Sequence, residues 1–198
     1  MACSTIIRGI NQVCGSNIGG IRELWIGAFG MVKTFTYEYL PTDPGTPVDL
    51  EDPTTYVADA DGNPIPISIS GVTLATGATT MQKFTFRKGA ASATNTLEVS
   101  DSGASFFTNA IQATFPRQDS DKRLSIQSLV EGEACALVKD ANGKYWFYGE
   151  TEPLTVTEGT VETGAQPGDA NQYTITISES ERRLPLPVAD AAVATLTA

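Results

Sequence analysis

The strongest local signal in the sequence is the stretch Ala134–Gly149, ACALVKDANGKYWFYG. Two strand-like runs flank the pair Asn142-Gly143, which readily takes the positive φ that a tight hairpin turn needs. The stretch therefore predicts a β-hairpin. Its second strand, Tyr145–Tyr148, is aromatic on both faces. Large aromatic side chains favour a place either deep in a stack of sheets or at a boundary between subunits.

Strand patterns continue on both sides of this hairpin. Residues 21–29 are apolar on both faces around Trp25, which is typical of a strand buried on two sides. Residues 33–39 carry aromatic side chains at every second position, so these share one face. Further alternating segments lie at 65–69, 84–86, 97–99, 107–115, 154–157 and 173–178. The chain is therefore predicted to be mainly β, with antiparallel sheets.

One short helix is expected at about 120–131. Asp119 or Ser120 can cap its N-terminus, and Gly132 ends it. A helix of this length needs tertiary contacts to persist in water. We expect those contacts to come from its apolar side chains packing on the sheet; these are Leu124, Leu129 and Val130.

Proline and glycine divide the chain into three regions. Residues 1–20 are Gly-rich and are expected to be an N-terminal arm, 21–183 a single β-sandwich domain, and the Pro-punctuated segment 184–198 a C-terminal arm. Within the domain, 41–64 contains many prolines, which break both helices and ladders. We expect a long surface loop there, and loops of this length in assembling proteins commonly reach a neighbouring subunit.

Composition excludes several classes of function. The chain has 198 residues and a formal net charge of −10, with scattered Lys and Arg. Such a surface does not grip DNA or an anionic membrane, because that affinity comes from clustered basic residues. The acidic residues either serve solvation alone or form a repulsive wall past which a polyanion slides. No apolar stretch approaches the roughly 18 residues of a membrane span, so no membrane partner is expected.

The sequence offers no constellation for catalysis. It contains no histidine, which removes the commonest general base and a principal metal ligand. We therefore expect neither enzymatic activity nor a cofactor. Asp59, Asp61 and Asn63 form a weak calcium candidate, and a plain Asx-rich turn is the alternative. Of the cysteines, Cys135 is expected to be a small buried hydrophobic residue, while a Cys3–Cys14 link is possible but unsupported.

Large apolar side chains supply candidates for a subunit interface. They are Trp25, Tyr145, Trp146, Phe147, Tyr148, Leu184, Leu186 and Val188. The aromatic run 145–148 could also form a stacking platform for sugars, as in a carbohydrate-binding module. For single-stranded nucleic acid the required basic groove is missing. Core or interface packing remains the favoured interpretation.

Three stretches of the sequence resemble a known group of proteins. They are 19–26, GGIRELWI; 141–150, ANGKYWFYGE; and 163–177, TGAQPGDANQYTITI, followed by Glu181. Together they resemble virion structural proteins from phages of Bacteroidota bacteria, a group associated with tail tube or major tail proteins. The resemblance covers the first and last thirds of the chain.

The resemblance implies an antiparallel β-sandwich or small barrel of the tail tube type. Subunits of this type form stacked, hexameric rings, and each subunit lends strands to a continuous inner β-barrel. The loop 41–64 and the terminal arms would bridge subunits or rings. The partners would be other copies of the chain and other virion proteins, with DNA only as passing cargo along an acidic lumen.

The same resemblance implies a location in the virion tail after assembly in the host cytoplasm. A capsid decoration or head-fibre protein is the alternative within the virion. A carbohydrate-binding module is the alternative outside it.

Overall fold

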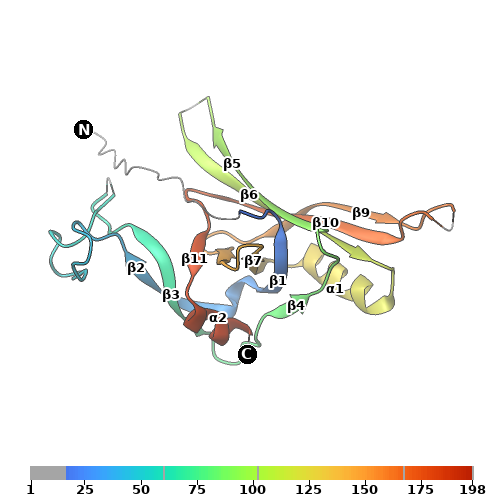
Figure 1. Cartoon of the computed structure of the whole chain (residues 1–198), viewed down its shortest axis with the longest axis horizontal. Coiled ribbons are helices and arrows are strands. Elements are labelled where there is room, and N and C mark those ends of the chain that lie inside the picture. The colour runs from blue at the N-terminus through green and yellow to red at the C-terminus, as the bar shows by residue number, and fades with distance from the viewer. Residues whose placement is uncertain (1–16, 60, 102, 167, 198) are drawn as a thin grey trace.

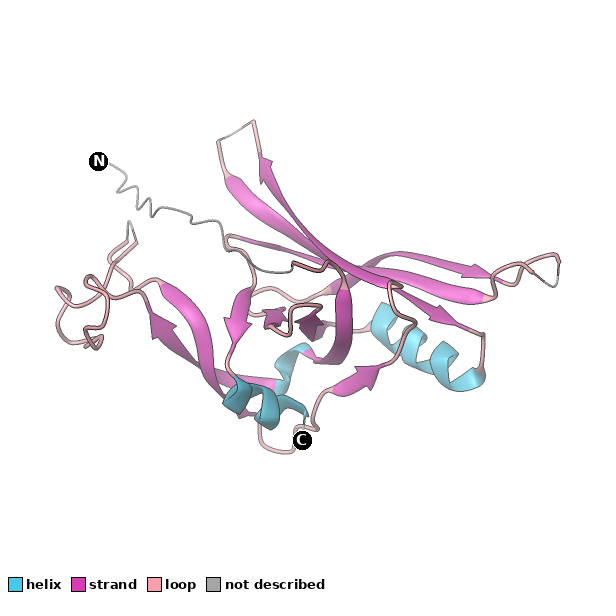
Figure 2. Cartoon of the chain, viewed as in Figure 1, coloured by secondary structure: helices cyan, strands magenta, loops and turns pink. Residues whose placement is uncertain are grey.

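The computed structural model describes residues 17–59, 61–101, 103–166 and 168–197. Within these residues the chain is mainly β, with two sheets and two α-helices (Figure 1, Figure 2). The predicted fold class is confirmed at this level, because the arrangement is that of a β-sandwich.

The larger sheet has seven strands in the order β2-β3-β11-β8-β7-β1-β4. In chain order its strands are β1 Ile21–Ala28, β2 Val32–Tyr39, β3 Pro66–Leu74, β4 Gln82–Phe84, β7 Ala134–Asp140, β8 Tyr145–Tyr148 and β11 Leu186–Val188. A short 3-10 turn, Phe29–Met31, links β1 to β2. The pairing of β11 with β3 is parallel, which corrects the expectation of purely antiparallel sheets. A parallel neighbour becomes possible because the chain reaches β11 from a distant part of the sequence.

The smaller sheet has four strands in the order β5-β6-β10-β9, and every pairing in it is antiparallel. Its strands are β5 Ala91–Val99, β6 Ser105–Pro116, β9 Thr155–Glu162 and β10 Gln172–Glu181. The helices are α1 Ser120–Glu131 and α2 Asp190–Thr197.

The hairpin of β7 and β8 is confirmed. Leu137 pairs with Phe147, and Gly143 has a φ of 90°. The backbone N–H of Asp140 donates to the Lys144 carbonyl oxygen at 2.9 Å, which closes a three-residue loop with glycine at its left-handed position.

Two apolar cores lie on opposite faces of the larger sheet. Leu24 of β1 and Val138 of β7 face the smaller sheet and pack with Ile111 of β6. Trp25 and Leu137 point the opposite way, into a core that α2 covers. The predicted burial of β1 on both faces is therefore confirmed, and this strand connects the two cores.

The segment 184–198 is expected to be an extended arm, but its described residues from β11 to α2 pack into the molecule. β11 inserts between β3 and β8, and α2 lies over the second core through its buried residues Ala192, Val193 and Leu196. The expectation was wrong because short segments with little apolar surface of their own gain a core once the sheet supplies the opposite side. The expected N-terminal arm falls mostly in 1–16, outside the described residues.

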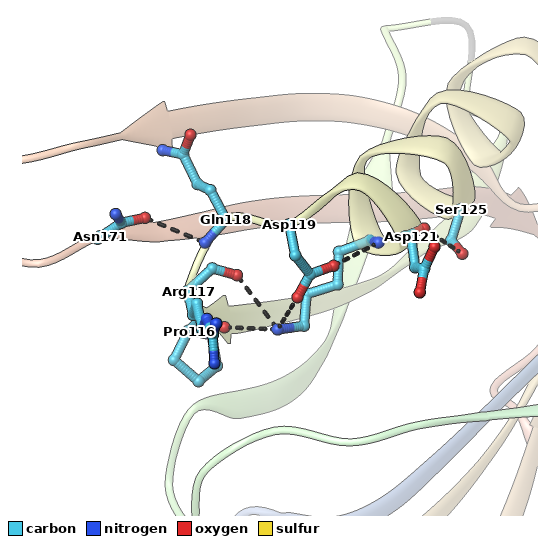
Figure 3. Close-up of polar contacts among 8 residues, drawn as sticks. Pro116, Arg117, Gln118, Asp119, Asp121, Ser125 and Asn171 are labelled. Atoms are coloured by element: carbon cyan, nitrogen blue, oxygen red, sulfur yellow. Dashed lines mark hydrogen bonds and ion pairs between the residues drawn. The ribbon is translucent and has the colours of Figure 1, made fainter.

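The bounds of α1 are confirmed, but its packing is not as expected. Asp119 accepts a hydrogen bond from the backbone N–H of Lys122 at 2.9 Å, so Asp119 is the N-cap (Figure 3). Leu124 and Val130 are mainly exposed, whereas Ile126 and Leu129 reach the core. The helix touches the core with only a narrow stripe of its surface, so the remaining apolar side chains face outward.

Residues 41–64 form the predicted long loop between β2 and β3. Its two ends are joined by a hydrogen bond from the backbone N–H of Leu40 to the Ile65 carbonyl oxygen, and Val57 inside the loop donates its backbone N–H to the Leu40 carbonyl oxygen. Asp49 and Asp52 organise tight turns inside it by accepting hydrogen bonds from nearby backbone groups. The loop is therefore internally structured at the edge of the molecule (Figure 1).

Candidate assembly surface

The four-stranded sheet β5-β6-β10-β9, here called the projecting sheet, extends beyond the rest of the molecule. The β5–β6 hairpin leaves the body on one side, and the β9–β10 hairpin leaves it on another (Figure 2). Burial follows this shape, since β5 is covered only at its beginning and β9 is exposed over nearly all its length. Most of the side-chain surface at these two ends has no cover from the described part of the chain.

Strands β5 and β9 are the two edges of the projecting sheet. Within the described residues, β5 pairs only with β6, and β9 pairs only with β10. Each is long, with 9 and 8 residues, and neither contains proline. Natural proteins normally protect such edges with short strands, prolines, bulges or charged side chains, lysine above all, because an open edge pairs readily with another chain. Neither edge carries a lysine or a proline; β5 contains one glutamate and no bulge, and β9 contains two glutamates and one bulge.

The inner face of the projecting sheet is apolar at both free ends. Val161 lies opposite the buried Tyr173, so it continues the core-facing side of β9, yet it is 61% exposed. Leu97 and Val99 hold the same position on β5 and are 56% and 67% exposed. These apolar side chains lie on the core-facing side of the projecting sheet, but beyond the region where the rest of the subunit covers that side.

The outer face of the projecting sheet is mainly polar, and its charged members are three glutamates. Its members alternate with the core-facing residues except at a bulge of β9 between Val156 and Glu158; they are Ser92, Thr94, Thr96, Glu98, Phe106, Thr108, Ala110, Gln112, Thr114, Pro116, Thr155, Glu158, Thr160, Glu162, Gln172, Thr174, Thr176, Ser178 and Ser180. Hydroxyl groups contact across strands, as between Thr114 and Thr174 at 3.1 Å. None of the four strands contains a lysine or an arginine.

The interface candidates from the sequence lie elsewhere, and most of them are buried within the subunit. β8 pairs with β11, which places Leu186 opposite Phe147 and Val188 opposite Tyr145. The rings of Trp25 and Tyr145 are 6.1 Å apart. Of the eight candidates, five are buried, Tyr145 and Trp146 are partly buried, and Leu184 is 49% exposed.

The aromatic strand therefore occupies the deep position, one of the two that its pattern allowed. Phe147 and Tyr148 are only 2% and 4% exposed, so they present no face on which a sugar ring could stack. Trp146 uses its indole N–H to donate to Asp140 at 3.1 Å. β11 and β7 pair with β8 on its two edges, so this strand lies inside the larger sheet.

Asp59 organises a turn through its own carboxylate. Its Oδ1 atom accepts hydrogen bonds from the backbone N–H groups of Asp61 at 3.0 Å and Asn63 at 2.8 Å. These backbone hydrogen bonds, that of Asn63 foremost, lower the pKa of Asp59. This is the Asx-turn arrangement that stood as the alternative to a calcium loop. Among the described residues, no group of three or more Cys, Asp or Glu side chains is placed to hold a metal ion.

Sequence reasoning missed a buried group of acidic side chains where the two sheets meet. Glu150 pairs with Arg183 and accepts a hydrogen bond from Tyr37 at 2.6 Å. Glu179 and Glu181 are 6% and 7% exposed. The signal was present, because both residues continue the two-residue period that Tyr173, Ile175 and Ile177 begin.

Cys135 behaves as the sequence predicts. It is completely buried, and burial raises the pKa of its thiol to about 12. Its Sγ atom donates a weak hydrogen bond to the Ala28 carbonyl oxygen at 3.5 Å. The considered Cys3–Cys14 link lies outside the described residues.

Comparison of the chain with known protein families, with characterised proteins and with solved structures found no match. Neither helix in the described ranges is long and apolar enough to cross a membrane.

Proposed function

We propose that this chain is a self-assembling structural protein, and more particularly the tail tube subunit of a bacteriophage. The observation that carries the proposal is the projecting sheet with its two open edges and its outer face without basic residues. The resemblance of three sequence stretches to phage virion proteins supplies the biological setting. No catalytic role is part of the proposal.

The two open edges have the polarity that ring closure needs. β5 is antiparallel to β6, β6 to β10, and β10 to β9, so β5 and β9 run in opposite directions. When β9 of one copy joins β5 of the next, the antiparallel pattern continues across the junction. Because the two joined surfaces differ, the contact is head-to-tail; repeated contacts of this kind form a ring when the rotation between neighbouring copies closes, and an open filament when it does not.

The pairing of β9 with β5 of the next copy would also bury the exposed apolar side chains at the ends of the projecting sheet. A neighbouring copy that pairs along β9 covers Val161, and the copy on the other side covers Leu97 and Val99. Burial of such side chains contributes roughly 25 cal/mol for each Å² removed from water. Edge pairing and apolar burial therefore favour the same contact.

The outer face of the projecting sheets would line the inside of the ring. Its Thr, Ser and Gln side chains are neutral, and its charged members Glu98, Glu158 and Glu162 repel phosphate. Affinity for DNA comes largely from Lys and Arg contacts with phosphates, so a wall without them lets DNA pass without holding it. The negative charge of the chain would then serve to keep DNA from binding to the wall of the tube.

The loop 41–64 would bridge to a neighbouring subunit or ring. It follows β2, the edge strand of the seven-stranded sheet (Figure 1). Asp59 and Pro64 of the loop line a pocket together with Phe106 of β6 and Ser180 of β10. A contact made by the loop does not use the edge strands β5 and β9. Rings can therefore close by one surface and stack by another.

The test compares assembly of three single variants with that of the wild type. Val161→Lys and Leu97→Lys place a charge on the apolar ends that a neighbour would cover. Leu124→Lys is the matched control, because Leu124 is also apolar and 59% exposed but lies on α1. We expect rings or tubes from the wild type and from Leu124→Lys at high concentration, and monomers of unchanged melting temperature from the other two.

Negative-stain electron microscopy and sedimentation velocity provide the readout. A wild type that stays monomeric at high concentration would argue against any assembling function. Closed rings that bind isolated capsids and never stack would instead support the capsid decoration alternative. Equal loss of assembly in all three variants would place the contact outside the projecting sheet.

A further inference from the structure

A polar pair lies inside the otherwise apolar space between the two sheets. Asn109 of β6 and Glu179 of β10 stand directly opposite each other in the strand register. Both belong to the core-facing set, in phase with Ile111 and Ile177. Asn109 is 0% and Glu179 is 6% exposed.

The hydrogen bonding of this pair is incomplete in a specific way. Asn109 Nδ2 donates to Glu179 Oε1 at 3.1 Å. Among the side chains that the structure describes, Asn109 Oδ1 and Glu179 Oε2 are the buried polar atoms without a hydrogen-bond partner. Both are acceptors when the carboxyl group is ionised, so neither can satisfy the other. Leaving two buried acceptors unpaired is costly, and native proteins rarely do so.

We propose that Glu179 keeps its proton in the folded subunit and donates it from Oε2 to Asn109 Oδ1. A single proton then satisfies both unpaired atoms. With the existing bond from Asn109 Nδ2, the acid and the amide form a closed ring of two hydrogen bonds that joins β6 to β10. The subunit thus contains a buried proton-binding site that stabilises the junction of its two sheets.

The surroundings of Glu179 favour the protonated form. Burial, and then the negative charge of Glu181, raise its pKa to about 8. The hydrogen bonds from Asn109 and from the Gly149 backbone act in the opposite direction, and the charge of Glu150 raises the pKa further. Desolvation disfavours the charged carboxylate, as it does for buried acids in general.

The neighbouring titratable groups do not neutralise a charge on Glu179. Glu181 accepts hydrogen bonds from the backbone N–H groups of Thr151 and Glu152 at 2.8 and 3.1 Å. Arg183 is paired with Glu150.

From the larger sheet, Tyr148 belongs to the core between the two sheets, whereas Cys135 points into the core on the opposite face and is influenced by Glu179 only through its charge. Burial, as the first cause, raises the pKa of each of these two groups to about 12. Both therefore stay neutral over the range in which Glu179 titrates.

The pair marks the place where the projecting sheet leaves the body. The next core-facing position outward places Phe107 opposite Glu181, with Leu97 exposed beside them. Inward of the pair, Ile111 and Ile177 are fully packed between the sheets. The proton therefore stabilises the base of the β5–β6 hairpin.

The sign of the pH dependence follows from the direction of the shift. The ordinary pKa of a glutamate is 4.5, and the folded value of Glu179 is about 8. The proton on Glu179 stabilises the folded subunit fully below pH 4.5. This stabilisation decreases as the pH rises between 4.5 and about 8, and it is lost above pH 8. Within the interval the equilibrium constant for unfolding rises up to about tenfold per pH unit.

The test is urea unfolding of the full chain at low protein concentration, over a pH range from about 5 to about 9. Glu179→Gln is the key variant, because its amide can donate to Asn109 Oδ1 and accept from Asn109 Nδ2 without a titrating proton. Glu158→Gln is the control, since it removes one negative charge at an exposed position of β9. Titrating groups that do not interact with Glu179 contribute equally to all three proteins and cancel in the ratios.

We expect the ratio of the wild-type unfolding constant to that of Glu179→Gln to rise by more than about 100-fold across this range. The ratio for Glu158→Gln should stay nearly constant. Equal pH dependence of the wild type and Glu179→Gln would overturn the proposal.

A second, independent measurement uses only the wild-type protein and does not depend on whether a variant folds. Difference infrared spectra of the folded wild type between pH of about 6 and about 9 should show a buried carboxylic acid band that is replaced by a carboxylate band. Absence of the acid band at the lower pH would also overturn the proposal.

Discussion

At the level of single residues, Gly149 is required for two reasons: its backbone conformation and the close approach of β7. Its φ is 81°, a region that side chains with a Cβ rarely adopt. A Cβ added there would stand 2.9 Å from Cys135 Cα and 3.0 Å from the Ala134 carbonyl oxygen. These are backbone atoms of β7, which cannot move without disturbing the centre of the sheet.

We expect Gly149→Ala to lower the free energy of unfolding by about 3 kcal/mol or more, because conformational strain and a backbone clash act together. Gly77→Ala is the control, since Gly77 also has a positive φ but nothing within 4 Å of the added Cβ. Gly77→Ala should lower the free energy of unfolding by about 1 kcal/mol, the cost of the backbone strain alone. Urea unfolding of both variants measures the difference, and equal losses would show that the close approach to β7 has no effect.

At the scale of elements, α2 completes the second core. The eight-residue helix is too short to be stable alone, so its stability comes from packing. Leu196 is fully buried among side chains of the larger sheet, and the Leu196 carbonyl oxygen accepts a hydrogen bond from the backbone N–H of Met81 at 2.8 Å. The C-terminal segment therefore covers the face of the sheet that the smaller sheet leaves open.

We expect Leu196→Ala to reduce the free energy of unfolding by about 3 kcal/mol, since it removes a completely buried side chain and leaves a cavity. Thr195→Ala, on the exposed side of the same helix, should change it by less than about 0.5 kcal/mol. Thermal and urea unfolding would check both values. A small effect of Leu196→Ala would mean that α2 is not firmly docked on the sheet.

At the scale of the whole molecule, charge opposes the assembly that the projecting sheet favours. Each copy carries a formal net charge of −10, so copies repel one another as they approach. The edge strands of the projecting sheet contain a few glutamates and no basic residue, so they do not offset this repulsion. Salt screens such repulsion between exposed charges over a distance of roughly 10 Å at 0.1 M.

We therefore expect self-association to strengthen as the ionic strength rises from about 0.05 M to about 0.5 M. Sedimentation velocity at several salt concentrations measures the assembled fraction. Val161→Lys should remain monomeric at every concentration, because salt does not remove a charge from an apolar contact. Dissociation of wild-type assemblies by added salt would indicate that ion pairs, and not strand edges and apolar ends, hold the copies together.

Local chemistry in the sequence was enough to predict several elements. The pair Asn142-Gly143 specified the hairpin through its backbone preferences, and Asp119 and Gly132 specified the ends of α1. The two-face apolar pattern around Trp25 predicted the burial of β1. Each of these signals acts between residues close in the chain, so it does not depend on which strands pair.

The candidate assembly surface was only partly accessible in this way. Alternation in the sequence revealed strands at 97–99 and 154–157, but nothing local distinguished edge strands from central ones. Exposure of Leu97 and Val161 depends on how far each sheet extends past the other. The sequence resemblance suggested ring formation, whereas the location of the open edges came from the fold.

The pattern of residues was sufficient to predict that the chain is mainly β, with a hairpin at 134–149 and a capped helix at 120–131. The tertiary fold was needed to show that 186–197 packs against the larger sheet, that the aromatic strand β8 lies inside that sheet, and that Glu179 is buried. This is because β11 and β10 acquire neighbours from distant parts of the chain. Burial of a side chain is then a property of those pairings and not of the residues beside it in sequence.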